Sequence, residues 1–470
     1  MKRATFVPGL VWLIALFATA TVPSVTTPAS VTTTAPQSGG ILKILWSTAP
    51  SVFGYPPELA GYNYIHALPA VETLVDLDND LHFKPSRLST TLVVSPDGKT
   101  MTISLGKGIK FHDGSDFNAS AVKWNLDAVR KAKATGTTKW TSVDVLDDYT
   151  IRINLSGPDS ITLASLGRST GMQISPTAFQ KNGIERARYN PVGTGPFRFK
   201  SFQRGVSLKY EKFDGYSQGL PYLDGVEYYF VTDPMVQVAS FKAGEEQVLY
   251  RAKGQQAYVL KSDQYTALGA MTSMMCMFPD SKNPESALSN QKVREALEYA
   301  IDREKIANSL GYGFWRATHQ PGIPELPAGY NADIKGRAYD PAKARQLLTE
   351  AGYAKGFKTK IIVDSSYQVN DALVAIQSYW KAIGVDMTME IVDRATLDQY
   401  RVANGWHDGF IFSVTDLDPL FLLSLDRLLS PENKLMISTL RPSGWADLMK
   451  QARAATNPDT TTELTKKLQR

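Results

Sequence analysis

The sequence predicts a mixed α/β protein built from two lobes. In the first half, short segments alternate between apolar and polar residues, which is the pattern of strands with one buried face. In the second half, apolar residues recur at helical spacing, and helix stop signals stand between the strands. One pattern gives way to the other near residues 265–285, so we expect the boundary between the lobes there.

Strand signals dominate the first half. Between Met101 and Phe111, apolar residues alternate with polar residues or glycine, and turn residues flank the segment on both sides. This pattern predicts a half-buried strand over 101–111. The other elements expected in this half are a strand at 41–46, a helix at 119–132, a hairpin with arms at 197–199 and 206–210, and a strand at 226–231.

Capped helices mark the second half. Asp340 is a predicted N-cap, Pro341 follows it at the first turn, and Gly352 stands at the expected helix end. The other elements expected here are a helix carrying Val293 to Ile301, a short helix from Asp302 to Gly311, a helix carrying Leu373 to Ile383 with Gly384 as its stop, and a strand at 387–392.

The composition excludes several classes of protein. A chain of 470 residues with 43% apolar side chains can form two or three cores of ordinary size. Cys276 is the only cysteine, so a disulfide framework is excluded, and the five histidines are too scattered to suggest a zinc site. The net charge of +5 includes no run of five basic residues, so we expect no nucleic-acid partner.

The first 38 residues indicate export. Two basic residues precede an apolar stretch over 10–17, which ends in the small residues Ala18-Thr19-Ala20. This pattern predicts a signal peptide at 1–20, cleaved after Ala20. The alternative is an uncleaved membrane anchor, although the apolar run is shorter than the ~20 residues that span a bilayer. Residues 21–38 are uncharged, rich in Thr, Ser and Pro, and free of cysteine, so they predict a linker without a lipid anchor.

Several short motifs could carry chemistry, but each favours a structural role. Gly215-Tyr216-Ser217-Gln218-Gly219 matches the nucleophile elbow of serine hydrolases, yet a polar stretch precedes it and Pro221 follows it. His112 beside Asp113 favours a turn histidine, because adjacent side chains on a strand point to opposite faces. The cluster Met274-Met275-Cys276-Met277 favours a core strand over a soft-metal site.

These observations predict a protein that is not an enzyme. No nucleophile, base and orienting group can be placed together, so we expect no catalytic residue, no metal and no cofactor. A secreted serine hydrolase using Ser217 remains the alternative function. The position of Ser217 distinguishes the hydrolase from a protein without catalytic activity. A hydrolase needs Ser217 directly after a buried strand, whereas a position in an exposed loop removes that alternative.

Several phrases, taken together and in order, resemble the family 5 extracellular solute-binding proteins of bacterial ABC importers, the peptide/nickel-type group. The phrases are Gly39-Gly40-Ile41-Leu42, Glu72-Thr73-Leu74, Ser95-Pro96-Asp97-Gly98-Lys99-Thr100, Gly108-Ile109-Lys110-Phe111-His112-Asp113-Gly114, Asn190-Pro191-Val192-Gly193-Thr194-Gly195-Pro196-Phe197, Phe213-Asp214-Gly215-Tyr216, Val293-Arg294-Glu295-Ala296-Leu297 and Tyr339-Asp340-Pro341-Ala342. The resemblance spans roughly residues 39–420.

The resemblance implies a type II periplasmic-binding-protein-like α/β fold, with two lobes, a hinge and a cleft between the lobes. We place the N-terminal lobe at 39–268 and the C-terminal lobe at 269–470. The chain departs from the family at Ala121, where an Asp is usual, and in lacking a lipobox cysteine. From the resemblance we also expect that the segment that in the family returns to complete the first lobe is missing after residue 470.

The resemblance also implies a function and a site. We expect an exported protein, in the periplasm or at the outer face of the cytoplasmic membrane, that acts as a monomer and delivers a peptide or similar small solute to the permease subunits of an ABC importer. Peptides, nickel chelates, haem and sugars all remain open as ligands. In peptide-binding relatives an acidic residue before an Asp/Glu-Pro pair meets the α-amino group. The expected ligand-binding residues are Asp416, Thr415, Trp406, Phe412 and Trp315.

Asp416 has two interpretations on sequence grounds. The family's acidic position falls on Thr415, or on Asp416 with a shift of one residue. A carboxylate in a closing cleft would suit a cationic ligand group, because a buried charge needs a partner. Alternatively, Asp416 caps a turn. Trp406, Phe412 and Trp315 are candidates for apolar walls, or for the core.

Overall fold

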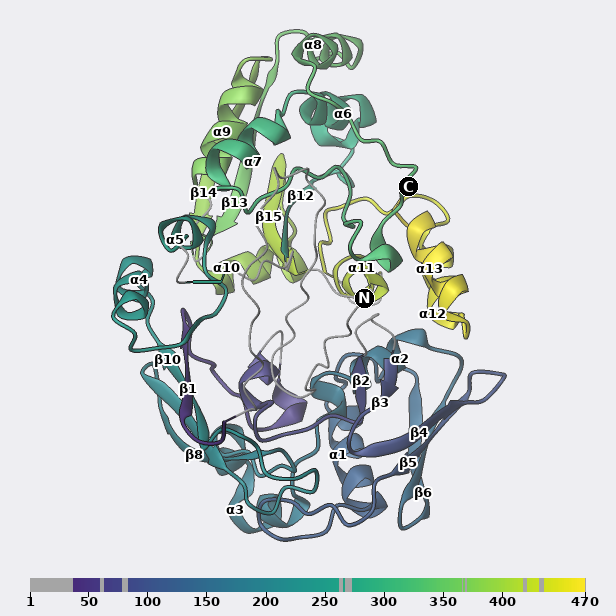
Figure 1. Ribbon diagram of the computed structural model, residues 1–470. Helices are drawn as coiled ribbons and strands as arrows, with labels where there is room; N and C mark the ends of the chain where they lie inside the picture. Colours follow the sequence, from purple (N-terminus) through teal and green to yellow (C-terminus); the bar gives the residue numbers. More distant parts are fainter. Residues whose placement is uncertain are drawn as a thin grey trace, which may run out of the picture. The chain divides into compact units, whose positions relative to one another are not determined.

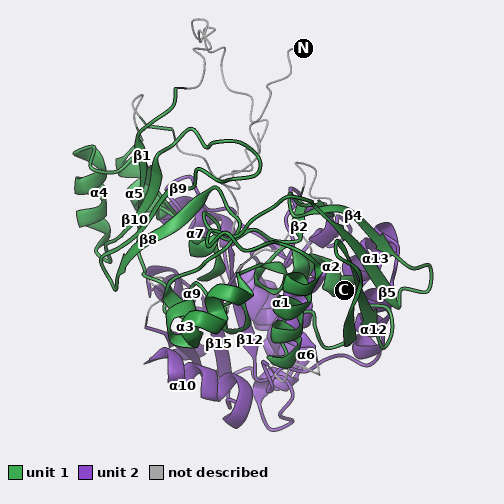
Figure 2. Cartoon of the chain, turned by 90° about the horizontal axis from the view of Figure 1, so that it is seen from below, with its two compact units in different colours: residues 1–270 green, residues 271–470 purple. Residues whose placement is uncertain are grey.

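The computed structural model describes residues 37–59, 63–77, 83–261, 265–266, 273–365, 367, 370–416, 421–430 and 435–469. The predicted signal peptide (1–20), most of the predicted linker (21–38), the expected lobe boundary at 268/269 and the side chain of Asp416 lie outside the described residues. The chain divides into two compact units, Met1–Ala270 and Met271–Arg470, which Figure 2 shows in different colours. We call them unit 1 and unit 2.

Unit 1 contains a mixed five-stranded sheet with the order β11-β1-β10-β9-β8. Its strands are β1 (Ile41–Trp46), β8 (Phe197–Gln203), β9 (Ser207–Lys212), β10 (Gly225–Phe230) and β11 (Val248–Leu249). β1 runs parallel to both β10 and β11, whereas β9 is antiparallel to β10 and to β8. The predicted first strand, the hairpin and the strand near 226–231 are confirmed.

A second, antiparallel sheet of unit 1 has the order β4-β5-β7-β6. Its strands are β4 (Ser89–Val94), β5 (Thr100–Leu105), β6 (Trp140–Asp147) and β7 (Thr150–Leu155). The prediction of one strand over 101–111 is wrong in its second half, because β5 ends at Leu105. Gly108 (φ +74°) turns the chain, and Ile109 and Phe111 are buried from an irregular segment.

The helices of unit 1 cover these sheets (Figure 1). The predicted helix at 119–132 is confirmed as α1 (Ala119–Lys131), whose N-cap Asn118 accepts a hydrogen bond from the backbone N–H of Ala121 at 3.0 Å. Val122, Leu126 and Val129 of α1 pack into the core of the antiparallel sheet. The remaining elements are the strands β2 (Val75–Leu77) and β3 (Phe83–Pro85) and the helices α2 (Ser160–Leu166), α3 (Pro176–Tyr189), α4 (Pro234–Lys242) and α5 (Gly254–Val259).

Unit 2 is built on a four-stranded sheet with the order β12-β15-β13-β14. The strands are β12 (Ser273–Pro279), β13 (Phe357–Asp364), β14 (Val385–Val392) and β15 (Gly409–Asp416). β13 is parallel to both β14 and β15, and β12 is antiparallel to β15. The carboxyl ends of three parallel strands therefore meet at one edge of this sheet.

Helices pack on both faces of the unit 2 sheet. One face, which includes Ile361 and Phe410, forms a core with α6 (Gln291–Tyr299), α8 (Pro341–Glu350) and α9 (Asn370–Lys381). The other face, which includes Ile362 and Ile411, packs against Leu397 and Leu428. These two leucines belong to α10 (Arg394–Gln399) and α11 (Phe421–Leu429), and Figure 1 shows α10 at the end of the sheet away from α6 and α8.

The predicted helix caps of unit 2 are confirmed. Asp340 accepts a hydrogen bond from the backbone N–H of Lys343 at 2.8 Å, and Asp302 caps α7 (Arg303–Leu310) in the same way. Gly352 has a φ of +89°, which glycine adopts without the steric cost that a Cβ would bring.

The last two helices, α12 (Trp445–Ala454) and α13 (Pro458–Lys467), are tied into unit 2. The side-chain amide of Asn331 donates to the Lys466 carbonyl at 3.1 Å, and that of Gln469 donates to the Gly329 carbonyl. Among the described residues, no helix is both long and apolar enough to cross a bilayer.

Candidate functional site

The sequence motifs of the first half meet around Glu72 in unit 1. The carboxylate of Glu72 accepts hydrogen bonds from the hydroxyls of Tyr216 and Thr194, both at 2.9 Å, and Arg87 donates to the Tyr216 hydroxyl. Burial raises the pKa of Glu72, while the hydrogen bonds from Tyr216 and Thr194 and the charge of Arg87 act in the opposite direction. The Glu72 carboxylate is held by side chains from distant segments, so the motifs build a scaffold there.

His112 belongs to the same scaffold. Its backbone N–H donates to the Gly193 carbonyl at 2.8 Å, and its ring Nε2 lies 2.9 Å from the Gly195 carbonyl oxygen. Burial lowers the pKa of His112 to about 4, so the ring is neutral at pH 7. Asp113 turns away from it and accepts a hydrogen bond from Ser175. The two side chains form no catalytic pair, as the sequence predicts.

Ser217 lies in an exposed turn. The preceding strand β9 ends at Lys212, and no helix starts between Ser217 and β10. A nucleophile elbow requires a strand immediately before the serine and a helix immediately after it. The hydrolase alternative is therefore not supported.

Cys276 lies in β12, opposite Ser413 of β15. Burial raises the pKa of its thiol to about 11, although the nearby Thr415 side chain acts in the opposite direction. The thiol is protonated at neutral pH and is a poor metal ligand. Among the described residues, no group of three or more His, Cys, Asp or Glu side chains could hold a metal ion.

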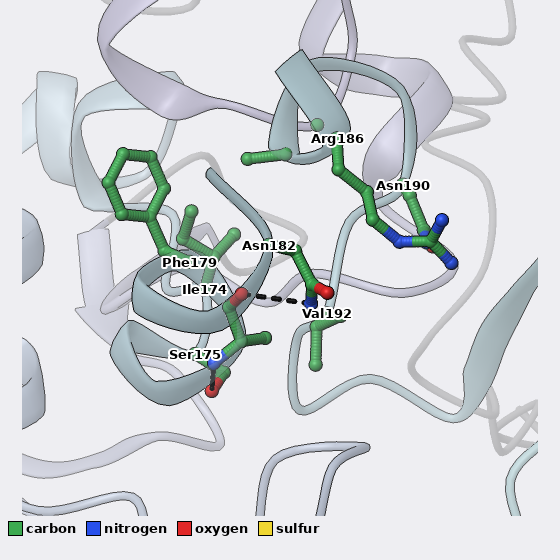
Figure 3. A pocket seen from close by; sticks show the side chains of 10 residues that line it. Ile174, Ser175, Phe179, Asn182, Arg186, Asn190 and Val192 are labelled. Carbon is green, nitrogen blue, oxygen red and sulfur yellow. Dashed lines mark hydrogen bonds between the residues drawn. The ribbon is translucent and has the colours of Figure 1, made fainter. Parts of the chain in front are cut away.

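Two hollows lie among the described residues of unit 1. Figure 3 shows a cavity beside α3, lined by residues that include Ser175, Asn182, Arg186 and Asn190. Its volume of about 20 Å³ is enough for about one water molecule. A larger hollow of about 710 Å³ beside Trp124 is an open surface groove.

The carboxyl edge of the parallel strands in unit 2 combines charge with burial. In open α/β sheets, ligands bind outside the carboxyl ends of the strands. Asp364 ends β13, Thr415 lies one residue before the end of β15, and Arg394 follows β14 by two residues. Asp364 is only 2% exposed and Thr415 only 4% exposed. We therefore take this edge as the candidate ligand site of unit 2.

Arginine side chains flank this edge. The Nη1 atom of Arg394 lies 3.6 Å from Asp364 Oδ2, and its Nε donates to Asp398 Oδ2 at 3.0 Å. Asp398 also accepts from Nη1 of Arg401 through its Oδ1 at 3.1 Å. The Arg401 side chain is 8% exposed, and its Nε is buried without a hydrogen-bond partner. Burial lowers the pKa of Arg401, and the charge of Arg394 adds to this effect.

The predicted ligand residues occupy different surroundings. Thr415 lies at the carboxyl edge, and the backbone of Asp416 forms the last position of β15. Phe412 is 2% exposed in the core with α6, α8 and α9, and Trp406 is 1% exposed in the core beside α10. Trp315 is half-buried and packs on Gly311 at the end of α7. The fold therefore uses Phe412 and Trp406 as core residues, and their contact with a ligand stays a prediction.

Sequence reasoning did not find Asp364, Arg394 and Arg401. Asp364 and Arg394 follow apolar strand segments, and polar residues after a parallel strand mark the ligand edge of a sheet. That signal needs the strand directions, which the sequence pattern does not supply. Arg401 carries no such signal, since only the packing of its helix brings it to this edge.

Comparison with known proteins places the chain in a family. Residues 84–434 match the family model "Bacterial extracellular solute-binding proteins, family 5 Middle". The glutathione-binding protein GsiB of Salmonella choleraesuis (strain SC-B67) is 36% identical over 296 residues, which cover 61% of this chain and 57% of that protein. The chain thus spans a little over half the length of the curated relatives it matches.

Solved structures show the same fold. DppA from Helicobacter pylori, in complex with the peptide STSA, matches with a TM-score of 0.76 and 25% identity over 92% of this chain and 90% of that one. AgaA from A. tumefaciens R10, in complex with agropinic acid, matches with a TM-score of 0.75 and 25% identity over 91% of this chain and 89% of that one. The predicted type II periplasmic-binding-protein fold is confirmed. This family comprises extracellular binding proteins and not enzymes. Because the family model matches three quarters of the chain, the chain belongs to the bacterial extracellular solute-binding proteins of family 5.

Proposed function

We propose that this protein captures a small solute outside the cell and delivers it to the permease of an ABC importer. The observation that carries this proposal is the family match over residues 84–434. That range includes the carboxyl ends of β13, β14 and β15. The buried polar groups at that edge are what a binding site for a polar solute requires.

The relatives suggest which solutes to try. GsiB is described as a glutathione-binding protein, and the structures of DppA and AgaA hold a peptide and agropinic acid. We propose a peptide or a peptide-like small solute for this chain. Asp416 and Thr415 are the proposed contacts of its amino group, with Trp315, Trp406 and Phe412 as apolar neighbours.

The proposal includes a location and a partner. The predicted signal peptide at 1–20 would direct the chain across the cytoplasmic membrane, to the periplasm or to the outer face of that membrane. There the protein would act as a monomer with the permease subunits. The two lobes are proposed to correspond to units 1 and 2.

Isothermal titration calorimetry on the purified chain tests the function. The panel contains glutathione, the peptide Ser-Thr-Ser-Ala and agropinic acid. It also contains the dipeptide Met-Leu and nickel–histidine, which are the ligands in two further solved structures of this fold. We expect at least one of these to bind with a Kd in the micromolar range or below, equivalent to about −8 kcal/mol. The variant Ser217→Ala should bind equally well. Absence of binding across the panel, combined with ester or peptide hydrolysis that Ser217→Ala abolishes, would contradict the proposal.

A further inference from the structure

One face of α1 in unit 1 lines an open surface groove. The groove has a volume of about 710 Å³, and the segment 55–58 forms its other wall. On the α1 side the lining residues recur at helical spacing, so they form a single face of the helix. They include Ser120, Lys123, Trp124, Asp127, Ala128 and Lys131. The opposite face of α1, with Val122 and Leu126, packs into the core.

Two aromatic side chains line this groove and contact a third ring. The ring centroid of Phe179, in α3, lies 5.3 Å from that of Tyr55 and 5.0 Å from that of Trp124. All three side chains are half-buried, so each keeps part of its surface exposed. Pro57 adds an apolar side chain to the wall. Grooves lined by aromatic rings are surfaces on which proline-containing segments bind in the polyproline II conformation.

The charged side chains that line the groove balance one another. Lys123 Nζ lies 2.8 Å from Asp127 Oδ2, and Glu58 accepts hydrogen bonds from Arg188 through both of its oxygens, at 2.6 and 2.7 Å. With Lys131, the lining residues comprise two carboxylates and two lysines, so they carry no net charge. Charge complementarity therefore favours a partner without charge over an anionic or a cationic one.

The linker at 21–38 has the composition that such a groove accepts. It contains no charged residue, and it has prolines at positions 23, 28 and 36. Proline restricts its own φ angle and biases the residue before it towards extended conformations, so less entropy is lost when the segment binds. Polyproline II has no internal hydrogen bonds. Its carbonyls can therefore accept from the indole N–H of Trp124 and the hydroxyl of Tyr55.

The linker is attached within reach of the groove. The backbone N–H of Gly39, directly after the linker, donates to the Tyr222 carbonyl at 2.7 Å, which fixes this point on unit 1. Gly39 and Tyr55 are 16 positions apart. A fully extended chain of that length spans at most about 55 Å, and bends between 47 and 54 shorten the distance. The linker itself spans about 56 Å as polyproline II, so it is long enough to reach the groove.

We propose that the linker, residues 21–38, binds in the groove between α1 and the segment 55–58 of the same chain. Because both partners belong to one molecule, the effective concentration of the linker at the groove is in the millimolar range. A Kd of about 1 mM is then enough to keep about half of the linkers bound. A bound linker is shielded from proteases outside the cell. This inference goes beyond the proposed function and does not depend on the solute.

Limited proteolysis of the full chain with elastase, which cleaves after small residues, tests the proposal. Mass spectrometry follows cleavage within 21–38, and a synthetic peptide of residues 21–38 gives the rate for an unbound linker. Because only the unbound linker is cleaved, the peptide should be cleaved at least about twofold faster than the same bonds in the wild-type chain. Ala128→Arg places a long side chain in the groove and should raise the rate in the chain to that of the peptide.

Two further variants keep this test decisive. Trp124→Ala removes an aromatic ring of the groove and should raise the rate as Ala128→Arg does. Tyr258→Ala removes an exposed aromatic ring of α5, which does not line the groove, and should leave the wild-type rate unchanged. Circular dichroism checks that each variant folds, and if Trp124→Ala does not, Ala128→Arg decides. A wild-type linker that is cleaved as fast as the peptide, or protection that persists in Ala128→Arg, overturns the proposal.

Discussion

Glu72 and Tyr216 lie 144 residues apart in the sequence and share a hydrogen bond of 2.9 Å inside unit 1. Thr194 donates to the second oxygen of the same carboxylate. One side chain thus joins three segments that lie far apart in the sequence. This arrangement shows how phrases so far apart in the sequence meet in the fold as structural contacts.

Glu72→Ala should destabilise unit 1. The change leaves the hydroxyls of Tyr216 and Thr194 without their acceptor and Arg87 without its nearby negative charge, so we expect a loss of about 3 kcal/mol in the free energy of unfolding. Urea denaturation followed by tryptophan fluorescence measures it. Glu285→Ala, at an exposed position of unit 2, is the control and should change the free energy by less than about 0.5 kcal/mol. Equal effects of the two variants would contradict a structural role of Glu72.

Stability should fall as the pH drops below about 6.5, partly because of His66. Burial lowers the pKa of His66 from 6.5 to about 4, so the folded state holds the neutral ring. A depressed pKa contributes stability above the unfolded value, and this contribution is lost as the pH falls from 6.5 towards 4. For one histidine the loss is about 3 kcal/mol over that window.

His66→Leu isolates this effect. The variant removes the titrating ring from its contact with Trp46, whose ring centroid lies 4.4 Å away, and should reduce the pH dependence of unfolding between pH 6.5 and 4 by about half, because the pKa of His112 is lowered to about 4 as well and that ring remains. The comparison is made as a difference from the wild type, because the raised pKa of Glu72 acts in the opposite direction. An unchanged slope in His66→Leu would show that His66 is not the group that titrates.

Gly193→Ala should destabilise the protein through a steric clash. A Cβ at Gly193 would lie 2.1 Å from the carbonyl oxygen of Ala70, and that backbone cannot move without disturbing its own hydrogen bond to Gly195. We expect a loss of about 1–3 kcal/mol or more, measured as a shift in the urea midpoint. Gly157→Ala meets no atom within 4 Å and should be nearly neutral. A neutral Gly193→Ala would mean that the two segments are not in contact.

Asp416→Asn should weaken binding of a peptide with a free amino group by at least about tenfold. A charge-assisted hydrogen bond of about 1.5–3 kcal/mol is lost, and ~1.4 kcal/mol corresponds to one decade in Kd. Titration with the N-acetylated peptide is the control. That peptide should bind the wild type poorly and should hardly distinguish the wild type from the variant. Equal affinity of the wild type for both peptides would show that Asp416 caps a turn.

The sequence by itself determined the local elements and the family. The cap at Asp340 and the stop at Gly352 depend on interactions within a few residues, so they could be located without any knowledge of the fold. The strand over 101–111 was predicted too long for the same reason. Alternation of buried residues continues through Ile109 and Phe111, although Gly108 turns the chain and the ladder to β7 ends.

Only the tertiary structure decided where the charged residues meet. Asp364 and Arg394 are 30 positions apart, and both reach the same edge because β13 and β14 pair in parallel with Asp364 opposite Val392. Arg401 joins them because α10 packs Leu397 against Ile362 on one face of that sheet. Apolar periodicity reports which face of a segment is buried, but the identity of the neighbouring segment depends on pairing between distant strands. The meeting of these charged residues therefore follows from the fold.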